Sequence, residues 1–397
     1  TIWLNNHHYI YLIKMKVYLD NAATTPLRDE VISSMFDVIK NYGNPSSTHS
    51  YGRSAKILIE DSRKIIAENL NVKPNEIIFT SGGTESDNSI LKSSVDDLGI
   101  ETIITSKIEH HAILNVVDYL SFKNVKIKYV NINNDGSIDI QDLENILSND
   151  NSKKLVTLMH VNNEIGKILD LKKVSSICKK HSTYFHTDAV QSIGHFRFDL
   201  DALDIDFLSA SAHKFHGPKG IGFSFIRKKS GLKSFIIGGS QERGLRGGTE
   251  AVHNIVGMGK AIYIAYKNLN YELKHILNLK SYLIKNLKTS FPDVVFNGAS
   301  DDLNLSSHTI LNVGFPNFKD NRELFNFNLD LKGIACSKGS ACQSGSISGS
   351  HVLNAINSDL NKKVPSIRFS FSHFNKIEEI DYLVEVLKSF SKTPISL

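Results

Sequence analysis

Short apolar runs and amphipathic helical patterns alternate along the chain from residue 76 to about residue 226. The apolar runs are rich in β-branched and aromatic residues, as strands are, and they cover residues 76–80, 102–106, 125–130, 155–160, 183–187, 205–209 and 221–226. Helical patterns such as residues 171–180 lie between them, and an amphipathic segment at residues 54–70 precedes them. This alternation predicts an α/β domain built on one seven-stranded, mostly parallel sheet.

The pattern changes after Gly257. A long helix rich in Lys and Leu is predicted at residues 258–287, followed by short strands near 309–313 and 366–371 and by a last helix at 377–390. Short strands between long helices indicate a second, smaller α+β domain.

The expected division of the chain follows from this change. We predict a large domain at residues 15–260, whose first residues pack with the small domain, and a small domain at residues 261–397. The small domain contains a Gly- and Ser-rich loop at about residues 336–350. Residues 1–14 precede the first Met and resemble no targeting signal, so we expect them to be a non-native or disordered extension.

Composition narrows the class of protein. The 397 residues are 41% hydrophobic, which is enough for a substantial core, and no apolar stretch is long enough to predict a transmembrane helix. The net charge of +5 comes from scattered Lys and Arg without a basic block, so we expect neither nucleic-acid nor membrane binding. The cysteines are three, Cys178, Cys336 and Cys342, which argues against a disulfide framework and for a reducing, cytoplasmic location.

Residues that can carry chemistry follow several predicted strands. In open α/β sheets, ligands bind beyond the carboxyl ends of the strands. Here one strand is followed by residues 81–85 (Ser-Gly-Gly-Thr-Glu), which open a helix and can bind an anion. Asp188 and Lys214 follow two other strands. No P-loop, dinucleotide-binding fingerprint or zinc-ligand spacing competes with this set, and we expect no metal site.

An anion cradle, a carboxylate and a lysine together meet the needs of a pyridoxal-phosphate (PLP) site. The protein must hold the phosphate, keep the pyridine nitrogen protonated and supply an amine for the aldehyde. Thr84 would serve the first need, Asp188 the second and Lys214 the third, as the Schiff-base lysine. Each signal alone is weak, because a lysine after a strand is usually a surface residue and an Asp there is usually a helix cap. Their combination favours PLP.

Longer strings of the sequence resemble one family of PLP enzymes. The strings are Val17-Tyr-Leu-Asp-Asn-Ala-Ala-Thr-Thr-Pro26, Gly43-Asn-Pro45, Phe79-Thr-Ser-Gly-Gly-Thr-Glu-Ser-Asp-Asn88, Glu109-His110, Met159-His-Val-Asn-Asn-Glu-Ile-Gly166, His186-Thr-Asp-Ala-Val-Gln191, Ser211-Ala-His-Lys-Phe-His-Gly-Pro-Lys-Gly220, Arg246-Gly-Gly-Thr249, Gly339-Ser-Ala-Cys342 and Ile367-Arg-Phe-Ser370. They are similar to class V aminotransferase-like enzymes of PLP fold type I, and among these to cysteine desulfurases of the NifS/IscS type. The resemblance covers nearly everything after Met15.

The resemblance implies pyridoxal 5'-phosphate as the cofactor and L-cysteine as the substrate. The cofactor-binding residues that it implies are Lys214, Asp188, Gln191, Thr84, Gly83, Ser211, His213, Asn163, His110 and Thr249. Thr249 would reach the phosphate of the other subunit, so a homodimer is implied. Arg368 and Asn163 would bind the substrate, and His110 would stack on the ring and transfer protons.

Cys342 would be the nucleophile of the implied reaction. Its thiolate would take the sulfur of L-cysteine as a persulfide and release L-alanine. The sulfur would then pass to acceptor proteins, such as an iron–sulfur scaffold, for cluster assembly, tRNA thiolation or both.

Alternatives remain open from the sequence. The chain could be another class V enzyme, an aminotransferase or a selenocysteine lyase, or a non-catalytic module with the same fold. His110 could only cap the helix that it begins, Arg368 could form a structural ion pair, and Cys342 could be a bystander thiol. We assign Cys336 and Cys178 to buried structural positions.

Overall fold

The computed structural model describes residues 15–321, 324–338, 349–356 and 364–391. The expected extension at residues 1–14 and Cys342 lie outside the described residues. The main sheet has the strand order β2-β8-β7-β6-β5-β3-β4. Its strands are β2 (Ile77–Thr80), β3 (Thr102–Thr105), β4 (Lys126–Tyr129), β5 (Lys154–Thr157), β6 (Tyr184–Asp188), β7 (Phe207–Ser211) and β8 (Gly222–Ile226).

Six of the seven strands point the same way. Strands β7, β6, β5, β3 and β4 pair in parallel, whereas β8 runs antiparallel to both of its neighbours, β7 and β2. Each strand overlaps one of the seven predicted apolar runs, so the predicted seven-stranded, mostly parallel sheet is confirmed.

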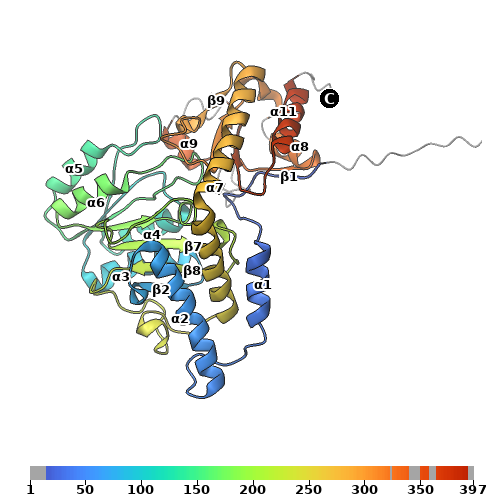
Figure 1. Cartoon of the computed structure of the whole chain (residues 1–397). Coiled ribbons are helices and arrows are strands. Elements are labelled where there is room, and N and C mark those ends of the chain that lie inside the picture. Colours follow the sequence, from blue (N-terminus) through green and yellow to red (C-terminus); the bar gives the residue numbers. More distant parts are fainter. Residues whose placement is uncertain (1–14, 322–323, 339–348, 357–363, 392–397) are drawn as a thin grey trace, which may run out of the picture.

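Helices cover both faces of this sheet (Figure 1). The helices of the described residues are α1 (Asp29–Val38), α2 (Ser50–Leu70), α3 (Gly83–Leu98), α4 (His111–Ser121), α5 (Ile140–Ser148), α6 (Leu171–Lys180), α7 (Val252–Ser290), α8 (Phe325–Leu331), α9 (His351–Ile356) and α11 (Ile377–Ser391). Of these, α8 and α11 pack in a separate core. The predicted helices at 171–180 and 377–390 are found with nearly the predicted bounds. Helix α7 begins at Val252, earlier than the predicted residue 258.

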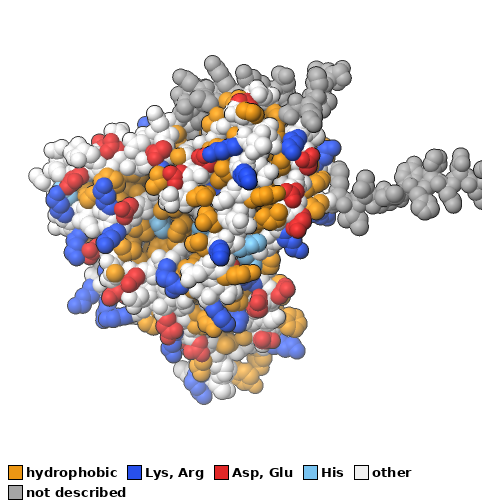
Figure 2. Space-filling view, turned by 45° about the horizontal axis from the view of Figure 1, so that its top comes forward, with side chains coloured by type: hydrophobic (Ala, Val, Ile, Leu, Met, Phe, Trp, Pro, Cys, Tyr) orange, Lys and Arg blue, Asp and Glu red, His pale blue; other side chains and the backbone are white. Residues whose placement is uncertain are grey.

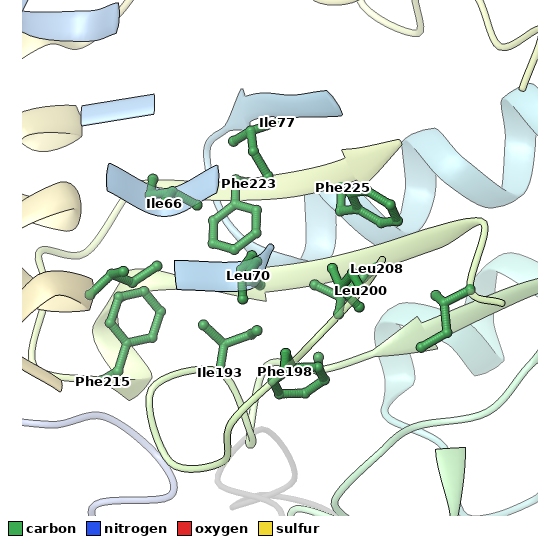
Figure 3. Packing of buried hydrophobic residues seen from close by; sticks show 14 of the residues in the cluster. Ile66, Leu70, Ile77, Ile193, Phe198, Leu200, Leu208, Phe215, Phe223 and Phe225 are labelled. Carbon is green, nitrogen blue, oxygen red and sulfur yellow. The ribbon is translucent and has the colours of Figure 1, made fainter. Parts of the chain in front are cut away.

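Alternate strand residues build two separate cores, one on each face of the main sheet, because successive side chains of a strand point to opposite faces. Leu208 and Val156 join the core under α2, α6 and the first half of α7. Their neighbours Phe207 and Leu155 join the core under α3 and α4. Figure 3 shows part of the first core, where Phe215, Phe223 and Phe225 pack with Ile66 and Leu70 of α2.

A second, three-stranded antiparallel sheet lies at the far end of α7 (Figure 1). Its strands are β9 (Val295–Phe296), β10 (Ile310–Gly314) and β12 (Ser366–Ser370). Nearby, β1 (Val17–Tyr18) pairs in parallel with β11 (Ile334–Ala335). These strands share a core with the second half of α7 and with α11, and Val17 and Leu19 belong to this core. Helix α7 thus contributes side chains to the cores of both sheets.

The surface mixes charges of both signs. Lys and Arg side chains are interspersed with Asp and Glu over the face seen in Figure 2. In the described part of the chain, none of the helices combines the length and the apolar character that crossing a membrane requires.

Candidate active site

Lys214 lies at the carboxyl end of β7, in a short 3-10 helix (Ala212–Lys214). Its Nζ donates hydrogen bonds to the backbone carbonyls of Ala22 at 2.6 Å and Ala23 at 2.8 Å. The side chain is half-buried, whereas the next residue, Phe215, is fully buried in the core beneath the sheet (Figure 3). Phe215 therefore anchors the segment from below, and Lys214 remains accessible above it.

Asp188 ends the neighbouring strand β6 and is 5% exposed. Burial raises the pKa of its carboxyl to about 6, while a hydrogen bond from Val190 N–H, at 2.9 Å, and the Lys214 ammonium act in the opposite direction. Gln191, one turn further on, donates from Nε2 to the Ala22 carbonyl at 2.9 Å. Gln191 and Lys214 therefore meet at the same carbonyl oxygen.

The turn from β2 into α3 forms a cradle of backbone groups. Gly82 has φ +151°, a backbone conformation that other residues rarely adopt, and a Cβ on Gly83 would lie 2.6 Å from Cγ2 of Val190, so both positions favour glycine. Helix α3 begins at Gly83, and the first N–H groups of a helix lack carbonyl partners within it. Ser211 Oγ lies 3.4 Å from the position of a Cβ on Gly82. The site can therefore hold an anion such as a phosphate.

Thr84 and His213 complete the residues expected around that anion. Thr84 is exposed in the first turn of α3. His213 precedes Lys214, and its Nδ1 lies 3.1 Å from Thr24 Oγ1. Burial, reinforced by the Lys214 ammonium, lowers the pKa of His213 to about 4. Its ring is therefore neutral at pH 7 and can serve as a hydrogen-bond donor or acceptor.

His110 is the N-cap of α4. Its Nδ1 accepts a hydrogen bond from Ala112 N–H at 3.1 Å. Burial, reinforced by Lys214 and by the nearby His111 and His351, lowers the pKa of His110 to about 4. Because Nδ1 accepts and the ring is neutral, the proton resides on Nε2. The capping role left open by the sequence is therefore real, and it also fixes the tautomer of a ring beside Lys214.

Arg368 comes from the second sheet, on β12, and is 1% exposed. Its Nη1 donates to the Asn163 carbonyl at 2.7 Å, and its Nη2 pairs with Asp20 Oδ1 at 2.9 Å. Its Nε has no hydrogen-bond partner among the described residues. The structure thus brings the two expected substrate-binding residues, Arg368 and Asn163, into contact, with the guanidinium held by Asp20.

Two further expected site residues are Thr249 and Cys342. Thr249 is exposed, in a segment whose Arg246 pairs with Glu85 of α3 at 3.0 Å. Cys342 lies outside the described residues. Cys336 is held by a hydrogen bond from its Sγ to Asn326 Oδ1 at 3.3 Å, and burial raises its thiol pKa far above the usual value. Cys336 is therefore a poor nucleophile.

Sequence reasoning missed several groups that shape the site. The Ala22 and Ala23 carbonyls and Asp20 lie in the string 17–26, but a string does not reveal which of its backbone groups faces a lysine. Two further buried carboxyl groups, those of Asp87 and Glu109, lie close enough to Asp188 for its charge to raise their pKa values. Their signal was an acidic residue beside an apolar element, which is usually read as surface charge.

Comparisons with known proteins identify the family. Residues 17–383 match the model of the family described as Aminotransferase class-V. A protein of Dictyoglomus turgidum named cysteine desulfurase IscS is 42% identical over 379 residues, which are 95% of this chain and 94% of that protein. A solved structure titled NifS-like protein is 38% identical, with a TM-score of 0.86 over 94% of this chain and 99% of the other. A structure titled SspA in complex with cysteine is 31% identical, with a TM-score of 0.78 over 91% and 100%.

These matches confirm both the resemblance drawn from the sequence and the fold class. They extend over nearly the whole of each relative, so the likeness is not confined to one motif or one sheet. The chain belongs to the class-V aminotransferase family, and within it to the cysteine desulfurases of the IscS and NifS type.

Proposed function

We propose that this protein is a PLP-dependent cysteine desulfurase that converts L-cysteine to L-alanine and retains the sulfur as a persulfide on Cys342. The observation that carries the proposal is the position of Lys214, whose amine meets the Ala22 and Ala23 carbonyls beside the buried carboxyl of Asp188. The relatives named cysteine desulfurase support the choice of substrate.

The residues of the site fit PLP. The Gly82-Gly83 turn, which carries no side chain, would let a phosphate approach the first N–H groups of α3, and Thr84, Ser211 and His213 would add polar contacts. Asp188 would pair with the ring nitrogen, Gln191 would donate to the ring oxygen, and Lys214 would bond to the aldehyde carbon. Bound there, the cofactor supplies an electron-withdrawing ring that weakens the bonds at the α and β carbons of an amino acid.

The protein's own groups would handle the protons. The Lys214 amine interacts with Asp188 and is held by two backbone carbonyls, and in its neutral form it would accept the α proton of the substrate. His110 holds a proton on Nε2 and receives a hydrogen bond at Nδ1, so in this state it can donate a hydrogen bond from Nε2 and is not a free base.

Arg368 and Asn163 would orient the substrate. A guanidinium binds a carboxylate with two parallel hydrogen bonds, and the Nε of Arg368 has no partner among the described residues. The substrate carboxylate would displace Asp20 from Nη2, while the Asn163 carbonyl keeps Nη1 in place. Burial of Arg368 keeps water away from this contact and so strengthens it.

The sulfur transfer needs only the thiol of Cys342 and the thiol of L-cysteine. The Cys342 thiolate attacks the substrate sulfur, the new S–S bond forms as the substrate Cβ–S bond breaks, and the electron pair of that bond stays on Cβ. Protonation at Cβ completes L-alanine. One thiol and one L-cysteine thus give one persulfide and one L-alanine, without an external oxidant.

Partners and location complete the proposal. We assign the persulfide sulfur to a protein acceptor for iron–sulfur cluster assembly, and we place the enzyme in the cytoplasm. A homodimer fits the exposed apolar side chains of Phe36 (71% exposed), Tyr51 (57%) and Ile237 (90%), on α1, α2 and the segment before Thr249. Light scattering should therefore give twice the chain mass, and charged substitutions at Phe36 and Ile237 should give monomers.

The decisive experiment is turnover of L-cysteine by the PLP-loaded protein. Wild type should form L-alanine and, with a reductant, an equal amount of sulfide. Cys342→Ser should lose both products, and the matched variant Cys336→Ser, which alters a buried thiol with a raised pKa, should keep them. Full activity of Cys342→Ser would contradict the persulfide step, and turnover that needs a keto acid would favour an aminotransferase.

A further inference from the structure

Three carboxyl groups are buried together under the site, and we call them the carboxyl cluster: Asp87, Glu109 and Asp188. Asp87 lies in α3 and is 1% exposed, Glu109 precedes α4 and is 1% exposed, and Asp188 ends β6. The charges of Asp188 and Glu109 both raise the pKa of Asp87, and the charge of Asp188 raises the pKa of Glu109. Buried like charges repel strongly, so the three groups cannot all be ionised at neutral pH.

The hydrogen bonds distinguish the three groups. Glu109 receives a bond from Ser106 Oγ at 2.6 Å on one oxygen and from Met159 N–H at 2.9 Å on the other. Asp87 interacts with Ser209, but its Oδ1 has no hydrogen-bond partner in the described part of the chain. A buried carboxylate oxygen without a donor is costly, whereas a protonated carboxyl loses much of that cost.

His186 is the basic group that faces Asp87. Its Nε2 lies 3.6 Å from Asp87 Oδ1 and 3.0 Å from Ser209 Oγ, and its Nδ1 lies 2.8 Å from Thr157 Oγ1. Two hydroxyl partners suit a neutral imidazole, which has one donor and one acceptor. Burial lowers the pKa of His186 to about 3, so it does not provide a cation for Asp87.

Lys214 is the cation whose charge affects the carboxyl cluster, and it lowers the pKa of Asp188. Burial raises the pKa of Asp87 well above its usual value and that of Glu109 to about 8, and the neighbouring carboxyl groups add to both shifts. The pKa of Asp188 is raised less, to about 6. At neutral pH the first negative charge of the cluster is therefore on Asp188.

We propose that Asp87 and Glu109 are positioning residues stored as neutral acids, so that the cluster carries one negative charge, on the carboxylate of Asp188 that faces the cofactor. This inference rests on the proposed PLP site. A proton kept on Asp87 removes the repulsion that would otherwise move a proton onto Asp188. In this arrangement Asp188 stays ionised beside the ring nitrogen, and only one of the three carboxyl groups bears the free-energy penalty of a buried charge.

The first test measures stability against pH, on the full chain without cofactor. A carboxyl that stays protonated in the folded state loses its proton on unfolding, so stability is full below pH about 4.5 and is lost as pH rises toward 8. Over pH 5 to 7, the unfolding equilibrium constant of wild type should rise about tenfold more per pH unit than that of Glu109→Gln. Asp87→Asn should also flatten the slope.

A contrary result is easily recognised. If Asp87 were ionised and paired with a protonated His186, the pair would still hold one proton, so Asp87→Asn would flatten the slope in the same way. Infrared spectroscopy of wild type separates the two states, because neutral carboxyl groups give a separate C=O band at pH 7. Glu109→Gln should weaken this band but not abolish it, and a band that Glu109→Gln abolishes would overturn the inference for Asp87.

The second test measures PLP binding and the visible band of the lysine-bound cofactor. Because an amide mimics a neutral acid, Asp87→Asn should bind PLP within about threefold of wild type, and Asp188→Asn should bind at least about tenfold more weakly. Equal losses in both variants would overturn the inference and leave the PLP site intact. Failure of wild type to bind PLP would instead overturn the proposed function, while the stability slopes would still report on the carboxyl cluster.

Discussion

Two lysines of the molecule, Lys214 and Lys280, have similar immediate partners and different surroundings. Lys214, at the end of β7, donates to the carbonyls of Ala22 and Ala23. Lys280, in the second half of α7, donates to Ser306 Oγ and to the Ser307 carbonyl, both at 2.7 Å. Lys280 is completely buried, whereas Lys214 is half-buried.

The difference lies beyond the first hydrogen bonds. The charge of Lys214 lowers the pKa values of Asp188 and His110, and Lys214 adjoins a turn that can hold a phosphate. Lys280 has Asp301 and Asp302 as its acidic neighbours, and burial lowers its pKa to about 7. Two carbonyl or hydroxyl partners thus make a lysine tolerable inside a protein. Access and a nearby buried carboxyl make it useful for chemistry.

The largest expected effect separates these two lysines. Lys214→Ala should lower the rate of alanine formation by about a thousandfold, because it removes both the covalent anchor and the proton carrier. Borohydride reduction and mass spectrometry should find the cofactor on the Lys214 peptide of wild type and on no peptide of the variant. Lys280→Met is the control and should keep the rate within about threefold. A comparable loss of rate in Lys280→Met would contradict the claim that only the surroundings of Lys214 make a lysine catalytic.

Arg368 provides a second test of the site around Lys214, namely of its binding of the substrate carboxylate. Arg368→Lys keeps the charge but loses the two parallel bonds to a carboxylate, so KM for L-cysteine should rise by about thirtyfold, with kcat changed by less than about fivefold. Steady-state kinetics would measure this split. Arg227→Lys is the matched control, because Arg227 binds backbone carbonyls of the chain, including that of Ile205. A fall in kcat alone for Arg368→Lys would contradict the assigned role.

The sequence predicted the main sheet well because its signal is local. Each strand of that sheet overlaps a short apolar run, and helices separate the strands from β2 to β6 along the chain. The strand order and the antiparallel direction of β8 were not predictable, since pairing depends on contacts distant in sequence. The domain division near residue 260 stays a prediction, and α7 crosses it.

The site was predictable in its residue types and less so in its contacts. Lys214, Asp188 and the Gly82-Gly83 turn follow strands, and the parallel sheet brings strand ends together. The pairing of Arg368 with Asp20 joins residues from opposite ends of the chain, so no local pattern could indicate it. The same holds for the carbonyls that hold Lys214.

The smallest expected effect tests Lys280 by pH. Its folded pKa, about 7, is below that of an unfolded lysine, so the folded protein has its full stability above pH about 10.4 and loses it as pH falls toward 7. Between pH 7.5 and 9, the free energy of unfolding of wild type should therefore rise, relative to Lys280→Met, by about 1 kcal/mol per pH unit. Denaturant titrations at several pH values would measure this slope. Parallel pH curves for the two proteins would mean that Lys280 stays charged when buried, and that Ser306 and Ser307 stabilise its ammonium.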